Sequence, residues 1–309
     1  AMMLFEGDYK AFFGRLGAVP AFIILLAVQV ILGPGGSIPR LMTLSYVTLK
    51  PYLFEGVSLL LFTIGSSLVV LAFTLRPQRL IALLGGVLTP LLLLLLFAVV
   101  SVGFYYHPEA PASPLGSGEA FSSGLQVGYN TLDLIASFMF APLVLAHFTR
   151  GGVVNRNAIR LMVKACVIAA GLLSMMYIGL TYVASFYTPL LEPSHHPEER
   201  LSAISNYLFG PVGGLIACVA VVFACLTTAI PLVSIFGAYL KNDLLGGKGG
   251  DVFPVVVTLA VSSLIANLGY MGIAGMLAHV LQVLCPGLIM LSLFNILHKL
   301  YEIRVPKTP

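Results

Sequence analysis

Long apolar runs with almost no charged residues recur along this chain, and they constrain its fold more than any other feature. Of its 309 residues, 59% are hydrophobic and only 9% are charged, whereas soluble domains average about 25% charged residues. A bilayer core about 30 Å thick requires roughly 20 apolar residues per helix, and the chain supplies that length repeatedly. The sequence therefore predicts an all-α polytopic membrane protein in contact with a lipid bilayer.

The lengths of the apolar runs predict about eight transmembrane helices within a single membrane domain, residues 1–309. The predicted spans are 16–38, 54–75, 80–104, 125–148, 161–187, 211–240, 252–268 and 273–297. Of the 16 Lys and Arg residues, all but Arg40, Lys50 and Arg200 fall on the side that holds both termini. By the positive-inside rule, both termini are expected in the cytoplasm.

A short polar run opens the apolar segment that ends at Phe148: Gly128-Tyr129-Asn130-Thr131-Leu132-Asp133. An ionisable residue in or near a span is costly and predicts a functional site, and half-helix ends can present their dipoles to a charged ligand. The predicted substrate-binding residues are Gly128, Tyr129, Asn130, Thr131 and Asp133. The alternative is a helix cap, in which Thr131 or Asn130 caps the helix and Asp133 occupies its favourable first turn.

A second polar group lies inside the predicted span 211–240, in the stretch Ala224-Cys225-Leu226-Thr227-Thr228-Ala229-Ile230-Pro231. Pro231 has no N–H and pushes the helix away from the Thr227 carbonyl. Two adjacent hydroxyls and this carbonyl would form an all-oxygen cluster suited to a hard cation such as Na⁺. In the alternative interpretation, the threonines bond back to their own helix and the proline is an ordinary kink.

Glycine and proline are concentrated between Gly33 and Arg40, where an ordinary helix cannot continue. Either the span is broken there and lines a cavity, or it ends in an outer loop, and the sequence favours the loop. Arg40 would face a substrate carboxylate or lipid headgroups. The stretch Asn267-Leu268-Gly269-Tyr270 predicts a tight connection between two spans.

Several classes of function find no support in the sequence. Paired carboxylates, a nucleophile elbow and a phosphate-binding glycine loop are missing, so the chain is not expected to be an enzyme. His195 and His196 lack a third spaced ligand, so no metal cofactor is expected. The basic residues lie in short loops, where they determine the orientation of the chain in the membrane. No nucleic-acid partner is therefore expected.

Several of these segments resemble the bacterial branched-chain amino acid carriers of the BrnQ type. Residues 124–133 resemble the family signature G-[FY]-x-x-G-Y-x-T-[ML]-D, residues 224–229 its A-C-L-x-T-A helix, and residues 33–40 its G-P-x-x-x-x-P-R segment. Asn267-Leu268-Gly269 and Cys285-Pro286 fall where the family has N-L-G and a proline-bearing helix. The matches keep their order and spacing over nearly the whole chain.

The resemblance implies a symporter of the bacterial inner (plasma) membrane that carries leucine, isoleucine and valine together with Na⁺ or H⁺. It implies a LeuT-like (APC-type) fold of inverted repeats, with broken helices at the substrate site. The run at 128–133 corresponds to the sixth family helix. Ala224, Thr227 and Thr228 correspond to the i, i+3 and i+4 ligands of Na⁺, which acts as the coupling ion.

The chain also departs from this family. The glycine-rich G-A-G-N segment of the first broken helix is absent, and the first two and last two family helices have no counterpart. The expected fold is therefore incomplete at both ends, and a separately encoded N-terminal helix pair becomes an expected partner. The alternative is a non-transporting fragment, a channel or a scaffold derived from a split or decayed transporter. A membrane-embedded enzyme would need clustered catalytic acids or histidines, which the sequence lacks.

Overall fold

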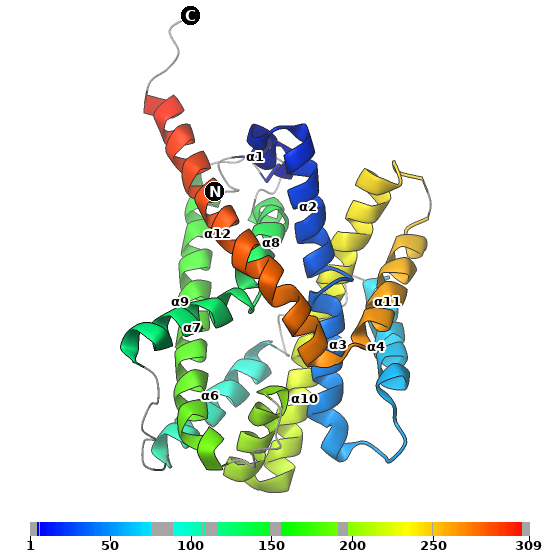
Figure 1. Cartoon of the computed structure of the whole chain (residues 1–309), viewed down its shortest axis with the longest axis vertical. Helices are drawn as coiled ribbons and strands as arrows, with labels where there is room; N and C mark the ends of the chain where they lie inside the picture. Colours follow the sequence, from blue (N-terminus) through cyan, green and yellow to red (C-terminus); the bar gives the residue numbers. More distant parts are fainter. Residues whose placement is uncertain are drawn as a thin grey trace, which may run out of the picture. The chain divides into compact units, whose positions relative to one another are not determined.

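A computed structural model describes residues 5, 7–75, 89–106, 108, 116–148, 156–190, 197–248 and 250–304. Within those ranges every regular element is helical and no strand occurs (Figure 1), which confirms the all-α prediction. The α-helices are α1 (Tyr9–Phe13), α2 (Ala18–Leu32), α3 (Ser37–Leu49), α4 (Leu59–Thr74), α6 (Thr89–Tyr105), α7 (Ser117–Tyr129), α8 (Asp133–Phe148), α9 (Arg156–Tyr187), α10 (Arg200–Tyr239), α11 (Val252–Ala266) and α12 (Gly269–Arg304).

Single helical turns extend several of these elements. They are the 3₁₀ turns η2 (Gly14–Leu16), η3 (Lys50–Tyr52), η5 (Thr188–Leu190) and η6 (Pro197–Glu199), and the π turn η7 (Leu240–Leu244). Between α11 and α12 the chain makes a two-residue turn at Asn267 and Leu268. This turn confirms the tight connection that the sequence predicts.

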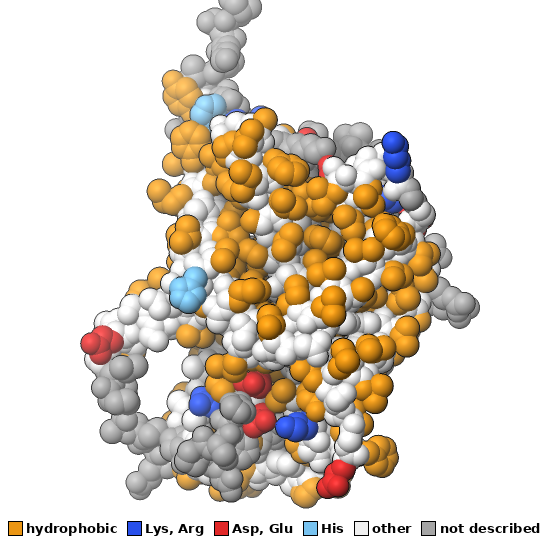
Figure 2. Space-filling view, turned by 45° about the vertical axis from the view of Figure 1, so that its right-hand side comes forward, with side chains coloured by type: hydrophobic (Ala, Val, Ile, Leu, Met, Phe, Trp, Pro, Cys, Tyr) orange, Lys and Arg blue, Asp and Glu red, His pale blue; other side chains and the backbone are white. Residues whose placement is uncertain are grey.

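Four helical segments in the described ranges are long and apolar enough to cross a membrane: Ala18–Tyr52, Ile159–Tyr187, Pro197–Leu244 and Gly269–Lys299. The helices α4, α6 and α11 are apolar but shorter. Hydrophobic side chains cover most of the face shown in Figure 2, and Leu68 of α4 and Leu264 of α11 are exposed. So extensive an apolar surface suits hydrocarbon rather than water, as a membrane protein requires. The number of spans and the LeuT-like order stay predictions.

The chain divides into two compact units. The first unit comprises residues 1–32, 116–171 and 275–309, and the second comprises residues 33–115 and 172–274. The first unit contains α1, α2, α7, α8, the beginning of α9 and most of α12. The second contains α3, α4, α6, α10, α11 and the end of α9.

In the second unit, α3, α4, α10 and α11 pack side by side (Figure 1). Their contact surfaces carry small hydroxyl residues beside the aliphatic ones, which lets the helices approach closely, as is common between membrane helices. The Oγ atoms of Ser67 on α4 and Ser263 on α11 lie 2.9 Å apart and form a hydrogen bond between the helices. Ser58 caps α4, since its Oγ accepts a hydrogen bond from the Leu61 N–H at 3.3 Å.

Also in the second unit, α6 and the end of α9 interlock through two reciprocal glycine–valine contacts. A Cβ atom added to Gly103 would lie 2.7 Å from Cγ1 of Val183, and one added to Gly179 would lie 2.7 Å from Cγ1 of Val100. Each valine therefore fills the space left by a glycine on the facing helix. The Tyr187 hydroxyl joins the same two helices, because it donates to the carbonyl oxygens of Gly103 and Tyr106. We call this arrangement the glycine–valine clasp.

The helix α10 folds back on itself at Gly210, whose φ of 71° and ψ of −177° interrupt the helical backbone. Few residues other than glycine tolerate that conformation. Ser202 Oγ and Cys218 Sγ lie 3.0 Å apart across the bend, and Asn206 approaches Gly214. The Tyr52 hydroxyl donates to Asn206 Oδ1 at 3.2 Å from outside the bend. Residues 200–209 thus form a short arm against the beginning of the helix at 211–239.

Candidate functional site

The polar run at 128–133 lies at a break between two helices of the first unit. The helix α7 ends at Tyr129 and α8 begins at Asp133, with a turn between them. The backbone N–H groups of Asn130, Thr131 and Leu132 each bond to a carbonyl three residues earlier, which tightens and ends α7. The break that glycine and polar residues suggested is therefore present.

The unusual backbone in this run belongs to Leu132, a residue that sequence reasoning did not single out. Leu132 has a φ of 66°, the only positive φ of a non-glycine residue in the described part of the chain. The left-handed region is costly for a leucine and tends to occur at functional sites. Gly128 is the predicted site residue whose type most readily allows a left-handed backbone, but it lies within α7 without a positive φ. No sequence signal marks a leucine for this role.

The break brings together groups that can bind the two charged groups of a zwitterion, an ammonium and a carboxylate. The N-terminus of α8, with Asp133 in its first turn, carries the positive end of a helix dipole. The Thr131 hydroxyl donates to the Gly128 carbonyl at 2.8 Å, at the negative end of α7. Asn130 and Tyr129 are half-buried, whereas Thr131 is exposed. An ammonium group suits the carbonyl end and Asp133, and a carboxylate suits the amide end.

The three residues proposed as cation ligands lie together on α10 in the second unit. The hydroxyls of Thr227 and Thr228 both donate to the Ala224 carbonyl, at 2.8 and 2.9 Å. The threonines thus make the bonds back to their own helix that the alternative interpretation describes. The same bonds hold three neutral oxygen atoms in one group. Ser234, further along the helix, bonds in the same way to the carbonyl of Ile230 at 3.0 Å.

A small pocket adjoins this oxygen group. It has a volume of about 40 Å³, and its lining includes Ala224 and Thr227 of α10 and Thr89 of α6. The rest of the lining is apolar, including Leu92 and Phe223. A water molecule needs about 10–15 Å³ measured this way. The pocket therefore has room for an ion with one or two waters. No sequence signal marks Thr89 as part of this lining.

The glycine- and proline-rich segment forms a four-residue turn, Gly33 to Gly36, and a helix resumes at Ser37. These residues are buried, so the favoured prediction of an outer loop is wrong, because the chain returns to a helix at once. Arg40 donates from Nη2 to the Tyr270 hydroxyl at 2.9 Å, and its guanidinium lies 5.1 Å from the centre of the Tyr270 ring. Tyr270 is thus a partner that the turn prediction missed.

The two candidate sites belong to different units, the run 128–133 to the first and the threonines to the second. In the described ranges no three His, Cys, Asp or Glu residues form a group that could hold a metal ion. His195 and His196 lie outside the residues described.

Comparisons with known proteins place these features in context. A family model described as "Branched-chain amino acid transport protein" matches residues 1–307. The chain is 30% identical over 98% of its length to the branched-chain amino acid permease BraB of Bacillus subtilis, covering 69% of that protein. It is 30% identical to the permease BrnQ of the same species (93% of this chain, 65% of BrnQ).

A third relative comes from another genus. The branched-chain amino acid transport system 2 carrier protein of Pseudomonas aeruginosa is 32% identical over 91% of this chain and 65% of its own length. The chain thus spans about two thirds of the length of these relatives. No solved structure matches it.

Proposed function

The chain belongs to the family of branched-chain amino acid transport proteins, and on that premise we propose that it forms the central part of a carrier. The carrier would move leucine, isoleucine or valine across the bacterial plasma membrane together with Na⁺ or H⁺. The observation that carries this proposal is the helix break at 128–133, which places two helix ends of opposite polarity beside a carboxylate. Relatives named as permeases and carriers of branched-chain amino acids support the substrate class.

In this proposal the break holds the charged groups of the substrate. The amide end of α8 would meet the carboxylate, and Asp133 with the carbonyl end of α7 would meet the ammonium group. Tyr129, Asn130 and Thr131 would complete the polar contacts through their side-chain oxygen and amide groups, with Gly128 leaving the approach open. Apolar walls would select the branched side chain. Each interaction depends on charge and not on side-chain length, so the polar site accepts any of the three substrates.

The coupling ion would bind to Ala224, Thr227 and Thr228. Rotation of the two hydroxyls about their C–O bonds would turn their protons away and expose three oxygens to a cation. Neutral hydroxyl and carbonyl oxygens bind a hard metal ion but do not carry a proton at physiological pH, so we favour Na⁺. Coupling to H⁺ would instead require a titratable group such as Asp133.

The wider architecture follows the family resemblance. We propose a LeuT-like inverted repeat with both termini in the cytoplasm, where most of the Lys and Arg residues then lie. About one third of the relatives' length has no counterpart in this chain. We propose that a further helix pair, on a longer or a separately encoded chain, supplies the other half of the substrate site.

The experiment is uptake of labelled leucine into proteoliposomes, with and without an inward Na⁺ gradient. It uses the chain alone and the chain extended by the BraB segment that precedes the matched region. Thr227→Ala with Thr228→Ala should abolish the stimulation by Na⁺ in whichever form transports. The matched control is Ser234→Ala, because this hydroxyl also bonds to its own helix but lies away from the pocket lining.

The outcomes separate the two classes of function. Unchanged Na⁺ stimulation in the double threonine variant would remove these residues from the cation site. If neither form takes up leucine, while Na⁺ and leucine still raise the melting temperature, the chain is a binding scaffold derived from a carrier. Absence of both uptake and ligand-induced stabilisation would refute the proposed function.

A further inference from the structure

The segment from Gly7 to Phe13, which we call the N-terminal clamp, packs on α8 at Pro142 within the first unit. Gly7 has a φ of 82°, and a Cβ atom added to it would lie 3.1 Å from Cβ of Pro142 and 3.2 Å from its Cα. The segment therefore needs glycine at this position both for its backbone and for the closeness of the contact. The contact is specific to the one proline inside α8.

The Tyr9 hydroxyl bonds to the same turn of α8. Pro142 has no N–H to offer the carbonyl four residues earlier, that of Phe138, and a proline ring crowds the carbonyl at that position. Tyr9 donates its hydroxyl proton to the neighbouring carbonyl, that of Met139, at 2.5 Å. Burial raises the pKa of Tyr9 to about 12, so the hydroxyl keeps its proton at physiological pH. The weak turn of α8 is thus held by a hydroxyl from another segment.

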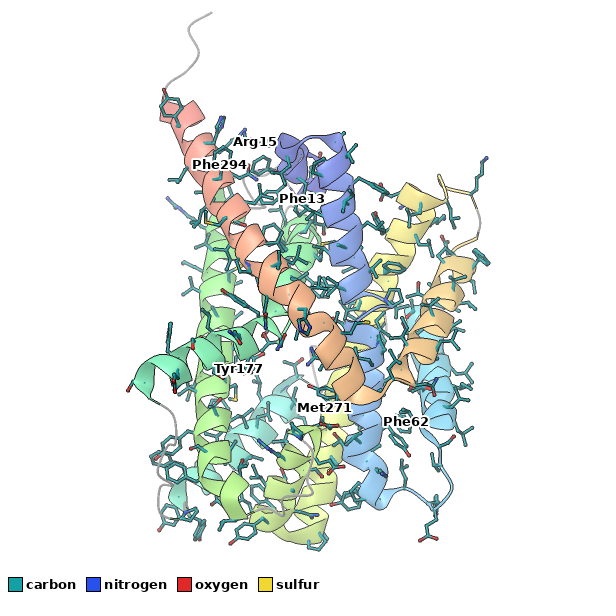
Figure 3. All side chains as sticks on the ribbon, viewed as in Figure 1. Phe13, Arg15, Phe62, Tyr177, Met271 and Phe294 are labelled. Atoms are coloured by element: carbon teal, nitrogen blue, oxygen red, sulfur yellow. The ribbon has the colours of Figure 1, made fainter. Side chains whose placement is uncertain are left out.

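The other end of the clamp is attached to α12. The Asn295 side chain, which is 0% exposed, donates from Nδ2 to the Phe12 carbonyl at 3.2 Å. The Phe12 ring meets the Phe138 ring of α8 edge to face, with 5.0 Å between their centres, and Phe13 lies beside Phe12. In Figure 3, Phe13 of α1 and Phe294 of α12 mark the two segments that the hydrogen bond between Asn295 and Phe12 joins. The clamp therefore links α8 to α12.

The part of α8 between Leu132 and Pro142 lies between two weak points of the backbone. Leu132 has a left-handed conformation at one end, and Pro142, inside the helix near the other end, removes one of its backbone hydrogen bonds. Proline kinks are places where helices bend, and the chain segments that absorb conformational change are few and local. A bend at Pro142 would move Asp133 and the amide end of α8, which the proposed function assigns to the substrate.

We propose that Tyr9 is a positioning residue of the carrier: through the Met139 carbonyl it holds α8 at the proline turn and thereby controls the movement of the substrate-binding half-helix. The link to transport rests on the proposed function. The mechanical part does not, because it concerns the bending of α8 in the chain by itself. Tyr9 touches no substrate and acts only through α8.

Hydrogen-exchange mass spectrometry on the purified 309-residue chain tests the mechanical part without any ligand. Tyr9→Phe removes only the hydroxyl, so amides flanking Pro142 should exchange roughly two- to tenfold faster, as expected for loss of one hydrogen bond. Gly7→Ala, which forces the segment away from Pro142, should produce the same local pattern. The matched control is Tyr301→Phe, an exposed tyrosine of α12 in the same unit, which should leave α8 unchanged.

Exchange in α11 of the second unit distinguishes positioning from general stability. A local increase in α8 with unchanged α11 supports the proposal. Unchanged exchange at α8 in Tyr9→Phe, or an equal increase in both helices, overturns it. In the uptake assay, Tyr9→Phe should change the maximal rate at least twofold with an unchanged KM for leucine. An unaltered maximal rate would overturn the proposal that Tyr9 controls transport. If the unsubstituted protein takes up no leucine, that result counts against the proposed function alone.

Discussion

The glycine–valine clasp between α6 and α9 gives a prediction whose magnitude follows from the geometry. In Gly103→Ala the new Cβ would lie 2.7 and 2.9 Å from the two γ-carbons of Val183 and 3.4 Å from its Cβ. Real Cβ atoms essentially never come closer than 3.0 Å to a neighbour. Val183 is only 2% exposed, and a valine in a helix has one strongly preferred rotamer. The neighbouring side chain therefore cannot turn away.

Overpacking of this kind costs typically 1–3 kcal/mol, and we expect the upper half of that range because both γ-carbons of Val183 collide. Replacing a helical glycine by alanine returns about 1 kcal/mol of helix propensity. The net loss in the free energy of unfolding should be about 1–2 kcal/mol. For a chain of this size, that lowers the melting temperature by roughly 2–8 °C.

Thermal melts in detergent provide the measurement, and Gly65→Ala on α4 provides the control. A Cβ atom at Gly65 would meet nothing within 4 Å, so this variant should melt at or slightly above the temperature of the unsubstituted protein. In the Gly103→Ala background, Val183→Ala removes both colliding carbons and should restore part of the loss. Equal melting temperatures for Gly103→Ala and Gly65→Ala, or no rescue by Val183→Ala, would refute the reasoning.

Three further outcomes are expected. Gly214→Ala places a Cβ atom 2.2 Å from the side-chain oxygen of Asn206, so the arm at residues 200–209 should move away from the helix at 211–239. The buried Cys218 thiol should then react faster with a maleimide, and an unchanged rate of labelling would contradict this expectation. Ser67→Ala removes the hydroxyl bond between α4 and α11 and should cost about 0.6 kcal/mol in the same melts, whereas a loss above about 2 kcal/mol would require another cause. The hydrogen bond that Lys241 donates, and secondly its positive charge, lower the pKa of the Asp251 carboxyl. A carboxyl group with a lowered pKa stabilises the folded protein at pH values above the ordinary carboxyl pKa, and this stabilisation is lost as the pH falls through the lowered pKa. Lys241→Met should therefore reduce the melting temperature at about pH 7, and the reduction should shrink as the pH falls below the ordinary carboxyl range. A loss independent of pH would exclude the charge as its cause.

The helical class and the helix break were predictable because both depend on local sequence. Apolar run length is enough to predict α-helices in lipid, since every backbone group must be bonded within its own segment. The polar run at 128–133 was recognisable because a carboxylate beside a span is rare. By contrast, the left-handed backbone of Leu132 depends on how two half-helices meet, and a leucine carries no local preference for it.

Contacts between distant segments were beyond the sequence pattern for a related reason. The bond of Tyr9 to the Met139 carbonyl joins residues 130 positions apart, and the pairing of Arg40 with Tyr270 joins residues 230 positions apart. Thr89 enters the lining of the pocket only because α6 packs on α10. The type of a single residue does not predict which distant helix its side chain will contact. Such partners follow from the packing of whole helix faces.

The bond between Asn295 and the Phe12 carbonyl joins residues 283 positions apart. This separation determines how long after Phe12 the ribosome adds Asn295 to the chain. At about 5–20 residues per second, a ribosome needs roughly 15–60 s to travel from one to the other. Throughout that interval Phe12 and Phe13, which are buried in the folded chain, have no α12 to pack against. The first unit therefore lacks one of its helices until α12 has been synthesised, and until then the aromatic rings of Phe12 and Phe13 must remain in lipid or in the insertion machinery.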